Sequence, residues 1–70
     1  MKVREVIRIL EDNGFRLDRQ KGSHRRFEGV VKGQTRGVTV SGKESDEINK
    51  ATLASIRRQS KLPNELFRPG

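Results

Sequence analysis

The sequence predicts a single small α+β domain spanning residues 1–70, in the order helix, three strands, helix. One stretch near each end of the chain carries apolar residues at helical spacing, and three stretches between them alternate apolar and polar residues as half-buried strands do. Only 30% of the residues are hydrophobic, which is enough for one packed layer. We therefore expect a three-stranded antiparallel sheet with both helices on one face and solvent on the other.

The first helix is expected over residues 2–13, because its apolar residues fall at i, i+3, i+4 and i+7 and so form one stripe. These residues are Val3, Val6, Ile7 and Leu10. Asn13-Gly14 should end the helix, since a glycine just past the last turn adopts the left-handed backbone conformation without steric cost.

Three strands are expected over residues 15–20, 23–31 and 36–41, joined by turns at Lys21-Gly22 and Lys32-Gly33-Gln34. Alternation assigns their apolar members to the core side of the sheet and their polar members to the open side. The residues predicted to point toward the core are Phe15, Leu17, Phe27, Val38 and Val40. The residues of the first strand predicted to face solvent are Arg16, Asp18 and Gln20.

The second helix is expected over residues 50–60, with Asn49 as its N-cap and Pro63 as its stop. The tail that ends in Phe67 should form one turn over an end of the core. Residues 68–70 should fray, because nothing in the sequence ties them down.

Basic residues dominate the charge, since sixteen Lys and Arg against nine Asp and Glu give a formal net charge of +7. Such an excess in a small domain favours a polyanionic partner: nucleic acid, an anionic membrane or an acidic protein. The cations concentrate around His24 and at Arg57-Arg58, although the second pair also fits the solvated face of a helix. No apolar run approaches the ~20 residues that cross a bilayer, so no membrane role is expected.

The chain has no cysteine, which fits a reducing compartment, and residues 1–5 lack the apolar stretch of a signal peptide. We therefore expect a cytoplasmic protein. One histidine and scattered carboxylates give no set of metal ligands, so neither a metal nor another cofactor is expected.

His24 is the only histidine, and histidine is the side chain whose ordinary pKa lies nearest neutral pH. Side chains alternate along a strand, so His24 and Arg26 should share the open face. Arg25 shares the parity of the inward-facing Phe27 and must reach out past the edge of the core. This pattern places a proton-transfer group beside cations, which fits the cleavage of RNA. A solvated histidine without a task is the plainer alternative.

The candidates for contact with RNA phosphates surround His24 in the sequence: Lys21, the backbone of Gly22 and Ser23, Arg25 and Arg26. Negative charge builds on the phosphate in the transition state of cleavage, and nearby cations stabilise it. His24 would act as general acid or general base. The second proton transfer would fall to water, to Lys21 or to a group of the substrate.

The chain resembles the HicA family of small toxins from bacterial and archaeal toxin–antitoxin modules over about residues 2–67. The segments that carry the resemblance are Gly14-Phe15, Lys21-Gly22-Ser23-His24 with Phe27, Val38-Thr39-Val40, Gly42-Lys43-Glu44, and Thr52-Leu53 with Ile56 and Leu62. The chain departs from the family in two places. It has no proline in the turn after the second strand, and neither proline nor histidine near Ser41-Gly42.

The resemblance implies a fold like that of double-stranded RNA-binding domains and an endoribonuclease activity on messenger RNA, which we expect to be metal-independent because the sequence offers no set of metal ligands. It implies that toxicity depends on the residue matched by His24, and that a HicB-type antitoxin binds the toxin and masks this histidine. We expect the free toxin to be a monomer. Two other classes stay open: a non-catalytic RNA- or DNA-binding module of the same fold, and an interaction protein that docks on an acidic partner without binding RNA.

Overall fold

The structure, a computed structural model, describes residues 1–68 of the 70-residue chain. Its elements are the helices α1 (Val3–Asp12) and α2 (Lys50–Ser60), the strands β1 (Arg16–Lys21), β2 (His24–Val31) and β3 (Gln34–Ser41), and the 3-10 turn η1 (Asn64–Phe67). The predicted α-β-β-β-α order is confirmed, and both helices end within one residue of their expected bounds. The fraying expected at the end of the chain falls mostly on Pro69 and Gly70, which lie outside the described residues.

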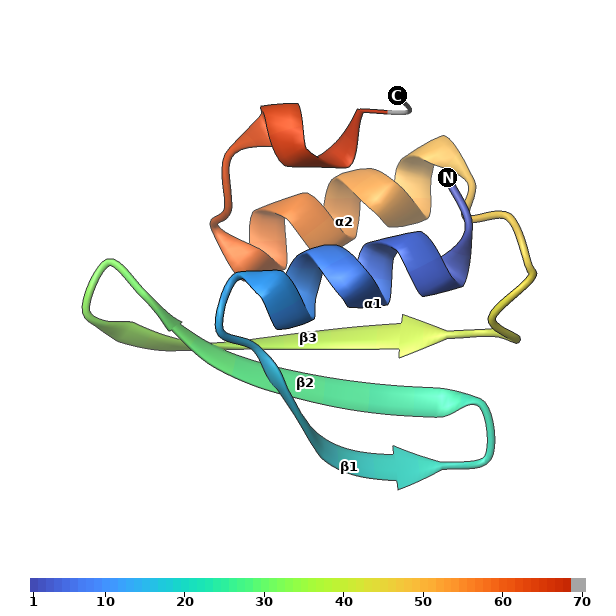
Figure 1. Cartoon of the computed structure of the whole chain (residues 1–70), viewed down its shortest axis with the longest axis horizontal. Helices are drawn as coiled ribbons and strands as arrows, with labels where there is room; N and C mark the ends of the chain where they lie inside the picture. Colours follow the sequence, from blue (N-terminus) through green and yellow to red (C-terminus); the bar gives the residue numbers. More distant parts are fainter. Residues whose placement is uncertain (69–70) are drawn as a thin grey trace.

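The three strands form an antiparallel sheet in the order β1-β2-β3, and both helices lie on the same side of it (Figure 1). The turn η1 lies beyond the helices and brings Phe67 into the core, as expected. Within residues 1–68 nothing covers the other side of the sheet (Figure 1). The buried hydrophobic residues, each at most 2% exposed, are Val3, Val6, Leu10, Phe15, Phe27, Val38, Val40, Ile56 and Phe67.

Backbone hydrogen bonds close both ends of α1. At the C-terminal end Gly14 has a φ of 86°, and the Phe15 N–H donates to the Leu10 carbonyl at 2.9 Å. This is the Schellman arrangement, and it confirms the role predicted for Gly14. At the N-terminal end the Val3 N–H donates to the Asp46 carbonyl at 2.9 Å, which ties the helix to the loop after β3.

Side-chain hydrogen bonds fix both ends of α2. Asn49 Oδ1 accepts from the Thr52 N–H at 2.8 Å, so the predicted N-cap is confirmed. At the other end the buried hydroxyl of Ser60 donates to the Arg57 carbonyl at 3.1 Å and accepts from the Leu62 N–H at 3.2 Å. Ser60 is the one fully buried polar residue within residues 1–68, and these two bonds satisfy the hydrogen-bonding capacity of its hydroxyl.

Two-residue turns join the strands and fix the register of the sheet. Gly22-Ser23 joins β1 to β2, and Gly22 has a φ of 59°, which glycine adopts without steric cost. Lys32-Gly33 joins β2 to β3, so Val31 pairs directly with Gln34. β3 therefore begins two residues earlier than the sequence predicts.

The prediction that Leu17 lies in the core is wrong. Leu17 shares a face with its cross-strand partner Phe27 but is 49% exposed. The cause is that β1 curls away from the helices, and neither helix reaches over it (Figure 1). Alternation along a strand reports the face on which a side chain lies, and says nothing of whether another layer covers that face.

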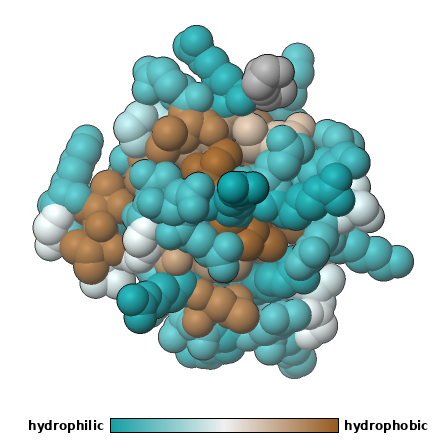
Figure 2. Space-filling model, viewed as in Figure 1, coloured by the Kyte–Doolittle hydropathy of each residue, from teal (hydrophilic) through white to brown (hydrophobic). Residues whose placement is uncertain are grey.

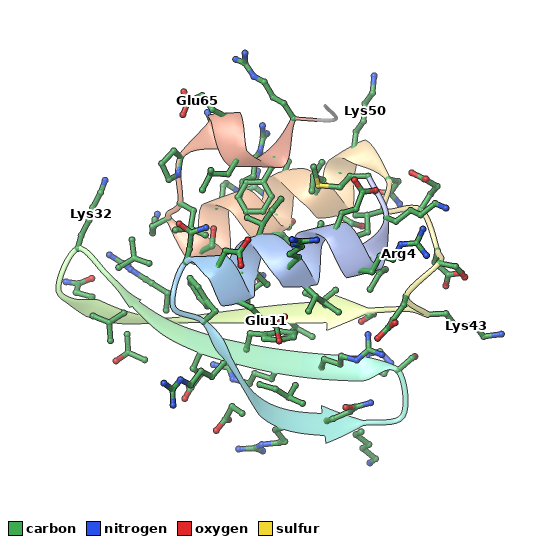
Figure 3. The ribbon with its side chains drawn as sticks, in the orientation of Figure 1. Arg4, Glu11, Lys32, Lys43, Lys50 and Glu65 are labelled. Carbon is green, nitrogen blue, oxygen red and sulfur yellow. The ribbon has the colours of Figure 1, made fainter. Side chains whose placement is uncertain are left out.

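Hydrophilic side chains dominate the surface, and the apolar patches between them are small and separate in the view of Figure 2. Lys32 at the tip of the β2–β3 hairpin, Lys43 after β3 and Lys50 at the start of α2 all point away from the body of the protein (Figure 3). No helix within residues 1–68 is long and apolar enough to cross a membrane.

Candidate functional site

The pairing register determines which side chains gather on the uncovered side of the sheet, because directly opposed residues of antiparallel strands point to the same side. His24 pairs with Lys21 of β1 and with Ser41 of β3. The successive rows of the open face are Lys21–His24–Ser41, Arg19–Arg26–Thr39, Arg16–Glu28–Gly37 and Val30–Thr35. The open face, defined by these eleven residues, thus carries four cations and one carboxylate.

A β-bulge at Asp18 determines what β1 contributes. Leu17 and Arg19 have consecutive partners on β2, so Asp18 is an extra residue without a partner. The expected alternation slips by one, and Arg19 and Lys21 are the paired residues of the open face. Asp18 and Gln20 are exposed, as predicted, but neither is a paired residue of the open face: Gln20 pairs with Arg25 on the helix-covered side, and Asp18 has no cross-strand partner. Because of the bulge, the open face carries Arg19 and Lys21 where regular alternation would have placed Asp18 and Gln20.

His24 lies exposed at the start of β2, on the face that alternation predicts. Its Nδ1 lies 2.9 Å from Ser41 Oγ, in a hydrogen bond across the β2–β3 pair. Whether Nδ1 donates or accepts depends on the tautomer. Nε2 has no hydrogen-bond partner among residues 1–68. The contact fixes the orientation of the ring and leaves Nε2 accessible to a ligand.

Lys21, Gly22 and Ser23 lie beside His24. Lys21 is paired with His24 across the β1–β2 hairpin, and Gly22-Ser23 is the exposed turn between them. The Gly42 N–H donates to the Ser23 carbonyl at 3.2 Å, which anchors this turn to the end of β3. The hairpin therefore holds a cation and the imidazole next to each other.

Arg26 lies on the open face, but its guanidinium turns away from His24 toward β3. A Cβ atom placed on Gly37 would lie 2.8 Å from Arg26 Cζ and closer still to Nη2. Nη2 is also 3.8 Å from Glu28 Oε2. The charge of Arg26 therefore lies over the Arg16–Glu28–Gly37 row, beyond the row to which its backbone belongs.

Arg25 does not join the other predicted site residues. It is paired with Val40 on the helix-covered side, and its side chain is 17% exposed. Its Nη2 lies 3.9 Å from Glu44 Oε1, in the loop after β3. The side chain thus reaches past the edge of the core, as expected, but in a direction that separates it from His24.

Arg19 and Ser41 belong to the open face and are missing from the predicted set. The signal for Ser41 is present in the sequence, because counting outward from a two-residue turn at Lys32-Gly33 pairs residue 24 with residue 41. A weaker signal marks the bulge that moves Arg19: the alternation stops after Asp18, because Arg19 and Lys21 are cations at positions that a regular strand would direct to the core side.

The cations of α2 lie on the opposite side of the sheet from His24 (Figure 1). Arg58 is exposed, and its Nη2 donates to Ser55 Oγ at 3.3 Å. Arg57 lines a shallow pocket of about 220 Å³, together with Lys50, Leu53 and Ala54. Arg58 therefore fits a solvated helix face, whereas Arg57 is half-buried and its Nε is buried without a hydrogen-bond partner within residues 1–68. No group of three or more side chains suited to hold a metal ion gathers within residues 1–68.

The fold and the open face define the class of this protein: a small, basic α+β domain that presents one histidine and several cations to solvent. The family model described as the HicA toxin of bacterial toxin–antitoxin matches residues 3–62, from the first residue of α1 to just past α2. The chain therefore belongs to the HicA toxin family. No curated protein and no solved structure matches it.

Proposed function

We propose that this HicA-family toxin is an endoribonuclease that cleaves messenger RNA, and that His24 transfers a proton in the cleavage step. One observation carries the proposal. The only histidine of the chain is exposed on the open face, with Nδ1 held by Ser41 Oγ at 2.9 Å and Nε2 accessible. Membership of a toxin family supports it further, since destroying messenger RNA arrests growth.

The cleavage uses the 2′-hydroxyl of the RNA as its nucleophile. The 2′ oxygen attacks the adjacent phosphorus and the bond from phosphorus to the 5′ oxygen breaks, which leaves a 2′,3′-cyclic phosphate and a 5′-hydroxyl. The proton of the 2′-hydroxyl passes to a base, and the departing 5′ oxygen takes a proton from an acid. A positioned imidazole that serves in either role accelerates such a step by about 10²–10⁴-fold.

Ser41 prepares His24 for both roles. A neutral imidazole acting as base takes a proton at Nε2, and an imidazolium acting as acid gives one up from Nε2. Nδ1 carries a proton in both cases, and Ser41 Oγ accepts it. With Ser41 Oγ as the acceptor, the hydrogen bond supports the tautomer in which Nε2 has its lone pair free, and it fixes the orientation of the ring.

Lys21 supplies positive charge beside His24, because the two residues are directly paired across the hairpin. Its ammonium stabilises the negative charge that accumulates on the phosphate in the transition state. The second proton transfer falls to Lys21, to water or to a group of the substrate.

A HicB-type antitoxin silences the toxin by covering the open face. An acidic partner suits a chain of net charge +7 whose exposed sheet face carries four cations and one carboxylate. Such a partner blocks the approach of RNA to His24 without any change in the fold of the toxin.

The test expresses the wild type, His24→Ala and Thr35→Ala in bacteria, with and without the antitoxin. Thr35 lies on the open face in the row farthest from His24, so Thr35→Ala is the control. The wild type and the control should arrest growth and produce messenger RNA fragments with 5′-hydroxyl ends, and the antitoxin should relieve the arrest. Arrest and cleavage that persist in His24→Ala would refute the assignment. Arrest without any fragments would identify a non-catalytic binding module.

A further inference from the structure

We propose that Arg19 and Arg26 form a second phosphate subsite on the open face, one row away from His24, which binds the RNA phosphate adjacent to the cleaved one. The identity of the ligand as RNA rests on the proposed function. The subsite deepens that function, because it gives the direction in which the RNA strand leaves the cleavage site.

The only ion pair that Arg19 and Arg26 form within residues 1–68 is the exposed contact of Arg26 with Glu28. The two residues are directly opposed on β1 and β2. Opposed side chains have Cβ atoms about 4.5–5.5 Å apart, and like charges so placed destabilise a sheet. Glu28 lies 3.8 Å from Arg26 Nη2, but both side chains are nearly half exposed, so this ion pair contributes little. Arg19 forms no ion pair within residues 1–68. A phosphate bound beside the two guanidinium groups would attract both of them and so offset the repulsion between their charges.

Gly37 keeps Arg26 in a defined position before any ligand arrives. Gly37 lies within β3 without a positive φ, so its backbone conformation does not require glycine, and glycine inside a strand weakens it. What the missing side chain provides is room, because a Cβ there would lie 2.8 Å from Arg26 Cζ. Arg26 consequently folds across β3, while Arg19 belongs to β1 on the other side of β2. Arg26 therefore has less side-chain entropy left to lose on binding.

The spacing along β2 suits consecutive phosphates of one strand. His24 and Arg26 are two residues apart, which is about 6.6–6.8 Å in an extended strand. This distance, which separates the backbone row of Arg19 and Arg26 from that of His24, is of the order of one nucleotide step, and the Arg26 guanidinium lies over the row beyond. An RNA whose scissile phosphate lies at His24 therefore places the next phosphate between Arg19 and the Arg26 guanidinium. No Phe, Tyr or Trp is among the eleven open-face residues and His24 carries their one aromatic ring, so bases find no extended stacking platform there and the phosphates are the groups to recognise. Guanidinium suits this task through paired hydrogen bonds to phosphate oxygens.

The test measures how salt affects the binding of a short fluorescent RNA of mixed sequence to His24→Ala protein, which should bind without cleaving. For a single strand, each lost phosphate contact lowers the slope of log affinity against log salt by about 0.7. We expect Arg19→Gln and Arg26→Gln each to reduce affinity several-fold and to reduce the slope by this amount. Arg8→Gln removes the same charge from an exposed position on α1 and should leave the slope unchanged.

A variant that changes no charge tests the geometry. Gly37→Ala fills the space that the Arg26 guanidinium occupies. We expect it to weaken RNA binding several-fold, and to cause no further loss in a protein that already carries Arg26→Gln. Thr35→Ala, on the same strand and face, is the matched control, and thermal unfolding followed by circular dichroism verifies that each variant is folded.

Wild-type affinity and slope in both arginine variants would overturn the subsite, as would a Gly37→Ala effect that persists without Arg26. If the arginine variants lose binding to the acidic antitoxin and keep their affinity for RNA, the pair is a protein contact and the subsite is wrong. Cleavage by the wild type is measured separately. Binding with no cleavage by the wild type would contradict the proposed function and leave the subsite standing.

Discussion

The helix-covered face of the sheet contains Phe27, Val38 and Val40, none more than 2% exposed, whereas the open face presents His24 and four cations to solvent. A slip of one residue on the covered face would turn its apolar set toward water, so burial specifies its register strongly. No such penalty applies to the open face, where one bulge in β1 decides which charged residues are displayed. One face therefore stabilises the fold, and the other is free to carry the chemistry.

The largest expected effect is the difference in stability loss between truncating a leucine that the helices cover and truncating one that they do not. Leu10 is fully buried on the core side of α1, while Leu17 is 49% exposed on β1. We expect Leu10→Ala to lower the free energy of unfolding by about 2–5 kcal/mol, which is severe for a domain this small. Leu17→Ala should lower it by less than about 1 kcal/mol. Urea denaturation measures both values, and equal losses would show that β1 is covered after all.

Two single-residue deletions in β1 isolate the effect of the bulge on RNA binding. Deletion of Asp18 removes only the extra residue and keeps Arg19 opposite Arg26, so RNA affinity should be at least that of the wild type. Deletion of Gln20 brings Asp18 opposite Arg26 and turns Arg19 to the helix-covered side. Affinity should then fall about tenfold at low salt, because a phosphate contact is lost and a carboxylate is gained.

Anisotropy titrations with the same RNA compare the two deletions, and both proteins should unfold cooperatively on heating. A Gln20 deletion that binds RNA as well as the Asp18 deletion would show that register does not govern the open face.

Removal of one hydroxyl should give the smallest effect. A hydrogen bond of this kind contributes about 0.5–1.5 kcal/mol, so we expect Ser41→Ala to slow RNA cleavage by up to about tenfold without changing RNA affinity. Ser41→Thr keeps the hydroxyl and should restore the rate. Nitrogen NMR of the imidazole reports the tautomer directly, and the fraction of His24 with unprotonated Nε2 should fall in Ser41→Ala. An unchanged tautomer and an unchanged rate would remove Ser41 from the mechanism.

The elements of the fold could be predicted because each has a local cause in the sequence. The apolar stripe and Gly14 specify α1, Asn49 starts α2, and Gly22 and Lys32-Gly33 specify the two turns. Leu17 could not be placed in this way, because its exposure depends on how far the helices extend over the sheet.

The site could be predicted only where it depends on alternation within one strand. His24 reaches the open face because Phe27 points the other way. Arg19 depends on a bulge that the sequence marks only by the break in alternation after Asp18, and the direction of Arg26 depends on the space left by Gly37 on a neighbouring strand. Periodicity within one strand can be read from the sequence alone, whereas contacts between strands can be predicted only when the pairing register is known.

The most direct test of the role of His24 is the single-turnover rate of RNA cleavage by purified wild type and His24→Ala at equal concentrations of folded protein. We predict that His24→Ala cleaves at least about 100-fold more slowly, while its free energy of unfolding stays within about 0.5 kcal/mol of the wild-type value, as for other exposed positions. Equal cleavage rates in the two proteins would show that the exposed imidazole takes no part in the reaction.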